Sequence, residues 1–107
     1  MAVAAAGLGV DALPGDPDGA APLGFSGVDD GGEVKSLYVR PDMMRRGLAG
    51  QLLAHGLGRA QVRGIQRLAA WATHFNLPVF QRAGFVLVER ARAEFAGAML
   101  ERIRVRI

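Results

Sequence analysis

The chain has 107 residues, half of them hydrophobic, and a formal net charge of +3 at pH 7. This length limits it to one small domain, and the apolar content favours a packed core over general disorder. The absence of cysteine excludes disulfides, thiolate zinc sites and a cysteine nucleophile. No segment reaches the roughly 20 apolar residues that a membrane-spanning helix needs. We therefore expect a soluble, cytoplasmic protein with no metal site.

The charge is distributed unevenly along the chain. Residues 1–33 contain six acidic side chains and no Lys or Arg, whereas residues 34–107 contain thirteen basic side chains and four acidic ones. A basic body favours a polyanionic partner, such as nucleic acid or a phosphorylated cofactor. The alternative is an ordinary solvated surface on which arginine replaces lysine, since Lys35 is the only lysine.

The first third of the chain predicts three strands of rising clarity. Residues 1–20 are rich in Ala, Gly, Pro and Asp, which indicates a weakly structured segment or an edge strand, with a weak strand over residues 2–10. Residues 22–28 are a better strand candidate. Residues 33–39, "EVKSLYV", alternate β-forming and polar residues, and Pro41 ends the strand because proline cannot donate to a ladder.

A helix is predicted over residues 44–63, with Gly64 as its C-terminal stop. Its apolar residues fall on one face, while Arg59 and Arg63 point elsewhere. The apolar face consists of Leu48, Leu52, Leu53, Leu57 and Ala60.

The rest of the chain predicts a buried strand over residues 65–73, a short helix over residues 76–83 with Asn76 as its N-cap, and a hairpin. The hairpin strands, residues 85–92 and 99–107, flank a turn at Gly97. In the last strand one face is apolar and the other carries arginines. These faces are Met99, Ile103, Val105 and Ile107 against Arg102, Arg104 and Arg106. The element order predicts one α/β domain, residues 1–107, with a mixed sheet.

The turn from residues 33–39 into the helix has the features of an anion site. The first N–H groups of a helix lack intrahelical partners, and the helix dipole adds positive potential there. Gly47, Ala49 and Gly50 let a phosphate approach closely, and Arg45 and Arg46 add full charges. The alternative is an ordinary helix start whose glycines permit tight packing. The glycine-rich fingerprints of dinucleotide-binding and P-loop proteins are absent.

"LYVRPDMMRRGLAGQLL", residues 37–53, resembles the acetyl-CoA signature of GNAT superfamily N-acetyltransferases. That signature has a strand, Val-x-Pro, and then [Gln/Arg]-x-x-Gly-x-[Gly/Ala]. Gly47 and Ala49 take the small positions, and Met44 stands where the family has Gln or Arg. "WATHFNLPVFQRAGFVLVER", residues 71–90, resembles a second family segment that ends in Gly-Phe, here Gly84 and Phe85. The resemblance covers residues 21–107.

The resemblance implies a mixed, mostly antiparallel sheet flanked by helices. It also implies direct acetyl transfer from acetyl-CoA to an amine acceptor, which is either a small molecule or a protein amino group. The strand over residues 33–39 should diverge from the next strand to receive the pantetheine arm, and the turn should bind the pyrophosphate. The implied cofactor-binding residues are Leu37, Tyr38, Val39, Met44, Arg45, Arg46, Gly47, Leu48, Ala49, Gly50, Thr73 and Phe80.

For catalysis the resemblance implies Glu33 as the general base, the alternative being a solvated residue after a turn. The family's tyrosine, a proton donor, is replaced by Phe80, which has no proton to give and is expected to pack on the cofactor arm. Thr73 takes the family's Ser/Asn position, with strand-end capping as the alternative. Tyr38 and Trp71 are expected in the core.

The family's first strand and two helices have no counterpart in this sequence, so we expect an N-terminally truncated domain with an uncovered sheet and a marginally stable monomer. A homodimer is one way to cover the sheet. Besides the N-acetyltransferase, two further hypotheses are a catalytically inactive CoA-binding module and, less favoured, a nucleic-acid-binding domain that uses the arginine face of the last strand.

Overall fold

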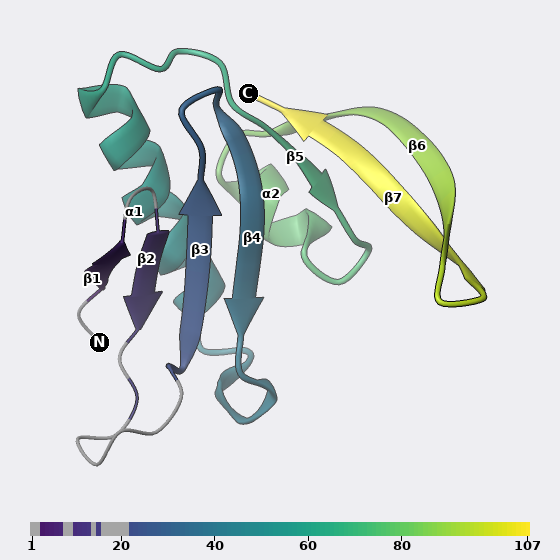
Figure 1. Cartoon of the computed structure of the whole chain (residues 1–107), viewed down its shortest axis with the longest axis horizontal. Helices are drawn as coiled ribbons and strands as arrows, with labels where there is room; N and C mark the ends of the chain where they lie inside the picture. Colours follow the sequence, from purple (N-terminus) through teal and green to yellow (C-terminus); the bar gives the residue numbers. More distant parts are fainter. Residues whose placement is uncertain (1–2, 8–9, 14, 16–21) are drawn as a thin grey trace.

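The computed structural model describes residues 3–7, 10–13, 15 and 22–107. This part of the chain forms seven strands, two α-helices and one 3-10 helix (Figure 1). In chain order these are β1 (Ala4–Gly7), β2 (Val10–Leu13), β3 (Gly24–Val28), β4 (Glu33–Val39), η1 (Pro41–Met43), α1 (Leu48–Val62), β5 (Ala69–Ala72), α2 (Leu77–Arg82), β6 (Val86–Phe95) and β7 (Ala98–Arg106).

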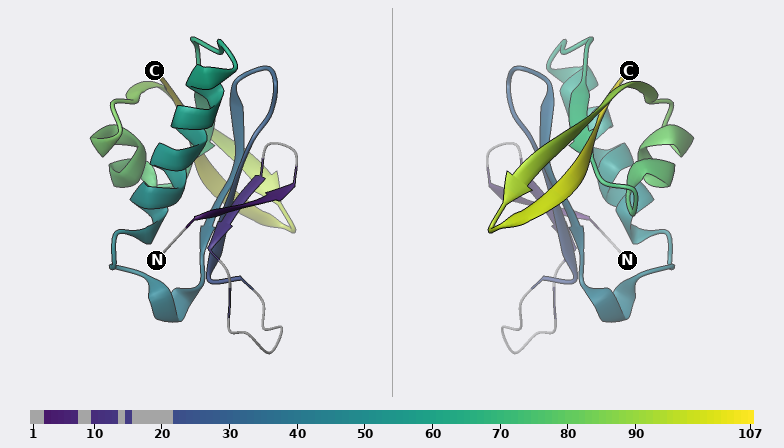
Figure 2. Two further views of the ribbon diagram at one scale, coloured as in Figure 1. Left: turned by 90° about the vertical axis from the view of Figure 1, so that its left-hand side faces the viewer. Right: turned by 90° about the vertical axis from the view of Figure 1, so that its right-hand side faces the viewer.

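The strands form one sheet in the order β1-β2-β3-β4-β5-β7-β6. Neighbouring strands are antiparallel except β4 and β5, which are parallel. Both α-helices lie on the same side of the sheet (Figure 2). The predicted mixed, mostly antiparallel sheet flanked by helices is confirmed. Within the described residues, no helix is long and apolar enough to cross a membrane.

The N-terminal segment differs from its prediction. Residues 2–10 were expected to form one strand, but they contain β1 and the first residue of β2, which pair antiparallel with a register shift between Ala5 and Gly7. The small residues of this segment give little side-chain contact to hold a single long strand, and glycine accepts turn conformations readily. Most of the turn-rich stretch over residues 13–22 lies outside the described residues.

Helix α1 begins four residues later than predicted. Arg45 and Gly47 have φ angles of 63° and 75°, which a right-handed helix does not accept, so the helix starts at Leu48. Its C-terminal end is close to prediction, since Gly64 with φ 79° follows shortly after Val62.

The predicted apolar face of α1 packs on the sheet. Leu48, Leu52 and Leu53 are at most 6% exposed, and burying each such side chain contributes roughly 1.5–3 kcal/mol. Gly24 of β3 permits this close packing, because a Cβ atom there would lie 3.1 Å from Leu52 Cδ1 and 2.6 Å from the Tyr38 carbonyl oxygen of the neighbouring strand. Arg59 does not point away as predicted: it forms an ion pair with Asp11, a buried residue of β2.

The C-terminal half follows the predicted order, with β5 and α2 shorter and β6 longer than predicted. The hairpin of β6 and β7 is confirmed, and Gly97 has φ 82° at its turn. Ile103 and Val105 are fully buried, but Met99 of the same strand face is 63% exposed. The reason is that the tip of the hairpin projects beyond the helices (Figure 1).

Candidate functional site

Strands β4 and β5 separate soon after they pair. Their parallel register contains only Glu33–Ala69 and Val34–Ala70, and the remaining length of β4 pairs with β3 alone. Figure 1 shows the two strands diverging toward their carboxyl ends. The edge of β4 that faces β5, over residues 37–39, therefore offers backbone groups to an extended ligand. Val39 and Leu37 turn their side chains toward the buried cluster below α1, while Tyr38 is 43% exposed.

The segment between β4 and α1 presents backbone N–H groups at the wide end of this gap. Gly47 takes the N-cap position of α1 with no side-chain hydrogen bond to the cap, and the first turn contains no acidic residue. A Cβ atom at Gly47 or Gly50 would meet no atom within 4 Å, so the space in front of this turn is open. Such a helix start attracts anions through its unsatisfied N–H groups and its dipole.

Apolar packing fixes the turn before α1, and charged side chains lie beside it. Leu48 packs in a cluster with Met43 and Val39, which fixes the first turn of α1 against the end of β4. Met44, Arg45, Arg46, Gly47 and Gly50 are exposed, and Ala49 is half-buried. The nearest carboxylate, Asp42, accepts hydrogen bonds of 2.6 and 2.8 Å from Arg40, and this interaction lowers the pKa of Asp42. Its negative charge is thus compensated beside the turn.

Thr73 and Asn76 bond to each other at the start of α2. The Asn76 N–H donates to Thr73 Oγ1 at 3.3 Å, and the Thr73 N–H donates to Asn76 Oδ1 at 2.8 Å. The Leu77 N–H also donates to the Thr73 carbonyl, so Thr73 has the contacts of an N-cap and Asn76 those of the residue three positions later. By backbone position Asn76 is the N-cap residue of α2, as predicted. Its side chain makes no capping hydrogen bond to the helix, and its Oδ1 accepts from the Thr73 N–H instead. The role of Thr73 in cofactor contact stays a prediction.

Phe80 lies inside the core. Its ring is 1% exposed and packs edge-on against Phe85, with ring centroids 5.1 Å apart. It belongs to the cluster between the helices and β5 and β7. The structure therefore places Phe80 below the gap between β4 and β5 and away from solvent, and its contact with the cofactor arm stays a prediction.

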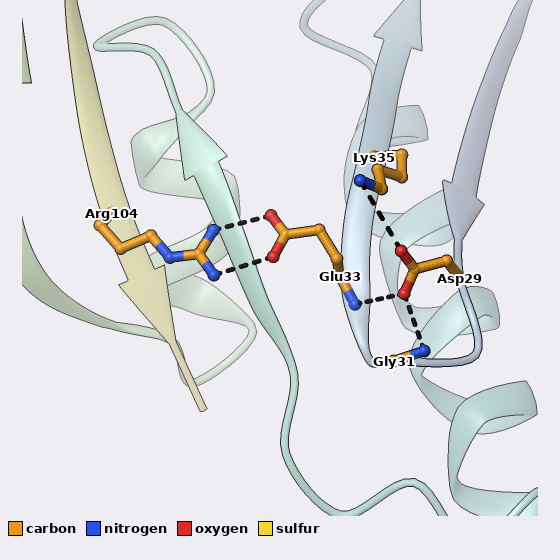
Figure 3. A network of polar contacts seen from close by, with 5 residues as sticks. All are labelled: Asp29, Gly31, Glu33, Lys35 and Arg104. Carbon is orange, nitrogen blue, oxygen red and sulfur yellow. Dashed lines mark hydrogen bonds and ion pairs between the residues drawn. The ribbon is translucent and has the colours of Figure 1, made fainter.

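Glu33 lies at the opposite end of β4 from the turn. Its two carboxylate oxygens accept hydrogen bonds of 2.7 and 2.8 Å from Arg104 of β7, which reaches across β5 (Figure 3). These bonds raise the pKa of Arg104. The Glu33 N–H donates to Asp29 Oδ1, so both the backbone and the side chain of Glu33 are held. The alternating arginines of β7 were the only sequence signal for this partner.

The face of the sheet opposite the helices carries aromatic side chains that were predicted in the core. Trp71 is half-buried there, and its ring lies 4.2 Å from the Arg102 guanidinium and 5.2 Å from that of Arg104. Tyr38 pairs with Phe25, with ring centroids 5.1 Å apart. Both core predictions are wrong, because both helices cover the other side of the sheet.

A comparison with known protein families agrees with the resemblance of these motifs. Residues 17–105 match the model of the acetyltransferase (GNAT) domain. The chain belongs to the GNAT acetyltransferase family. No curated protein matches the sequence significantly.

Solved GNAT structures share the fold. A GCN5-related N-acetyltransferase from Rhodopseudomonas palustris is 23% identical, with a TM-score of 0.77 over 91% of this chain and 59% of its own. A ribosomal-protein-alanine N-acetyltransferase from Brucella melitensis is 17% identical, with a TM-score of 0.76 over 92% of this chain and 67% of its own. A putative acetyltransferase from Salmonella typhimurium, solved with acetyl-CoA, is 19% identical, with a TM-score of 0.74 over 92% of this chain and 62% of its own. The chain thus spans about three fifths of the first of these GNAT structures.

In this GNAT domain the predicted residues form two groups and one outlier. The β4 edge and the turn before α1 adjoin through Val39 and Leu48. The second group is Thr73, directly after β5, and Phe80 of α2. Glu33 stands apart at the narrow end, where it is one of the two β4 residues that pair with β5.

Proposed function

We propose that this GNAT domain binds acetyl-CoA and transfers its acetyl group to an amine. The observation that carries the proposal is the open helix start at Gly47, which adjoins the unpaired edge of β4. In the proposed complex, the backbone amides of residues 45–50 hold the pyrophosphate of acetyl-CoA, and Arg45 and Arg46 add positive charge. The β4 backbone over residues 37–39 pairs with the pantetheine arm.

Bound acetyl-CoA supplies a thioester that an amine attacks directly. The nitrogen–carbon bond forms as the carbon–sulfur bond breaks, and the amine loses a proton while the thiolate gains one. Glu33 is the proposed proton acceptor, since its carboxylate lies at the narrow end of the gap and is 24% exposed. Phe80 has no proton to donate, so water protonates the thiolate.

A catalytically inactive acetyl-CoA-binding domain is the second candidate. It is supported by the two bonds from Arg104, which occupy both oxygens of Glu33, and by the buried ring at position 80. Release of CoA in the presence of any amine would exclude it.

Calorimetric titration with acetyl-CoA tests the proposed binding. Gly47→Val should reduce the affinity at least tenfold, because a β-branched residue disfavours the left-handed φ of 75° and places its side chain in the open space before the amides. Gly58→Ala is the matched control: Gly58 is exposed on α1, and its Cβ would meet no atom within 4 Å. This control should bind like wild type, and equal affinity in Gly47→Val would refute the assignment.

A further inference from the structure

A hollow of about 550 Å³ lies at the narrow end of the gap between β4 and β5, at the beginning of β4. Its volume is in the range of small-molecule sites in proteins. The ionisable side chains that line it are Glu33, Arg67, Arg104 and Arg106. These side chains bring three positive charges against one negative charge, and with the terminal carboxylate of Ile107, which also lines the hollow, the balance still favours anions.

The Glu33–Arg104 pair is placed to exchange partners with a ligand. Its side chains are 24% and 26% exposed, so solvent reaches both. A guanidinium binds carboxylate or phosphate through two parallel N–H groups, as Arg104 binds Glu33 here. A ligand with both an ammonium and an anionic group keeps every charge paired when it inserts, since its anion replaces Glu33 on Arg104 and its ammonium binds Glu33. An amine without an anion takes Glu33 from Arg104 and leaves it only the longer-range attraction of Glu89.

The surroundings of Arg104 hold it ready for this exchange. Trp71 lies beneath its guanidinium and that of Arg102, and cation–π contacts of this kind restrain the arginine side chain. The hollow is also separate from the turn before α1. The seven residues of β4 span about 20 Å at the usual rise of a strand, so the two sites lie at opposite ends of the same strand.

From these contacts we infer that the hollow binds the acceptor, and that the acceptor is a small amine that also carries a carboxylate or phosphate group. Calling the ligand an acceptor rests on the proposed acetyl transfer. The binding of the ligand itself depends only on the hollow. Arg104 binds the anion, Arg67 and Arg106 add to the positive potential, and Glu33 receives the ammonium.

The single tryptophan of the chain, Trp71, reports on this exchange by fluorescence, because Arg104 lies against its ring. The titrations compare β-alanine with propylamine, and phosphoethanolamine with ethanolamine. We expect a saturable change with the two amines that carry an anionic group, and at least tenfold weaker binding of propylamine and ethanolamine, which carry only the ammonium. Preference for β-alanine or for phosphoethanolamine then distinguishes a carboxylate from a phosphate ligand.

Variants locate the binding site. Arg106→Gln should weaken binding of the anionic amines at least fivefold, whereas Arg92→Gln, an exposed arginine of the same hairpin that does not line the hollow, should not change it. Equal responses to amines with and without an anionic group, no response to either anionic amine, or equal affinity in Arg106→Gln would each overturn the inference.

Acetyl-CoA calorimetry on the same samples separates the two hypotheses. Binding of acetyl-CoA without a response to β-alanine or phosphoethanolamine leaves the proposed function standing and refutes the acceptor site. A response to the anionic amines without acetyl-CoA binding refutes the proposed function and leaves the hollow as an amine-binding site.

Discussion

Asp11 of β2 and Arg59 of α1, 48 residues apart in sequence, form an ion pair between the sheet and the helix whose start is the proposed pyrophosphate site. The Asp11 side chain is 2% exposed, and His55 Nδ1 lies 3.3 Å from the same oxygen. A buried carboxylate is tolerated only when it is paired. Arg59 therefore contributes to the fold and not to a solvated face.

Arg59→Met should destabilise the domain by about 3 kcal/mol, because it leaves a buried charge without its main partner. Arg63→Met is the control on the same helix: Arg63 pairs with Asp30, whose side chain is 93% exposed, so the loss should stay below about 1 kcal/mol. Urea unfolding of both variants measures the free energies. Equal losses of unfolding free energy would show that the Asp11–Arg59 pair stabilises the domain no more than the exposed Arg63–Asp30 pair does.

The local elements were predictable because their signals are local. The strand over residues 33–39 and the buried face of α1 follow from periodicity, and Gly64 and Gly97 mark a helix end and a turn. The late start of α1 was not predictable, since Arg45 adopts a left-handed φ that non-glycine residues seldom take.

The tertiary contacts of the site could not be predicted from the sequence. The partners Glu33 and Arg104 are 71 residues apart, and they meet only because β7 inserts beside β5 in the strand order. The alternation along β4 shows that Tyr38 and Val39 face opposite sides. It does not show that both helices cover the side of Val39, which is what exposes Tyr38 and Trp71.

Asp29 should make the stability depend on pH in the acidic range. Its Oδ1 accepts hydrogen bonds from the N–H groups of Glu33 and Gly31, and Lys35 lies nearby, so its pKa is lowered below 3.8 (Figure 3). Because the folded-state pKa is depressed, the contribution of the charge is present above pH 3.8 and is lost as the pH falls through the folded value.

In Asp29→Asn the amide oxygen keeps both backbone bonds but not the charge. We expect the variant to be less stable than wild type at pH 6 and the difference to vanish near pH 2, as measured by urea unfolding at both values. A difference that is independent of pH would contradict the assignment to the carboxylate charge.

The Thr73–Asn76 pair should stabilise α2 as a capping pair. Thr73→Ala should cost about 1 kcal/mol, because it removes the acceptor of the Asn76 N–H, whereas Thr73→Ser keeps the hydroxyl and should stay near wild type. A double-mutant cycle with Asn76→Ala measures the coupling, which we expect to be at least 0.5 kcal/mol for residues in direct contact. Additive losses would mean that the two side chains act independently.

Acetyl-CoA titration of the Thr73 variants tests whether Thr73 also contacts the cofactor. If Thr73 contacts the cofactor through its hydroxyl, Thr73→Ala should bind acetyl-CoA more weakly than Thr73→Ser does. If capping is its only role, the two variants should bind acetyl-CoA alike once both are folded.

Glu33→Gln tests the proposed general base. Loss of a positioned base reduces kcat/KM by on the order of 10²–10⁴. Glu101→Gln is the control, since Glu101 is also paired with an arginine, Arg90, but on the projecting hairpin away from the hollow. Steady-state CoA release with an anionic amine gives both rates, and the control should match wild type.

The split between binding and turnover separates proton transfer from structural support. If Glu33 accepts the proton of the amine, Glu33→Gln should lower kcat well beyond any weakening of anionic-amine binding in the Trp71 titration. If Glu33 only orients Arg104, the variant should bind the anionic amine more weakly and should keep its kcat. A variant with the wild-type rate and the wild-type affinity would remove Glu33 from the mechanism altogether.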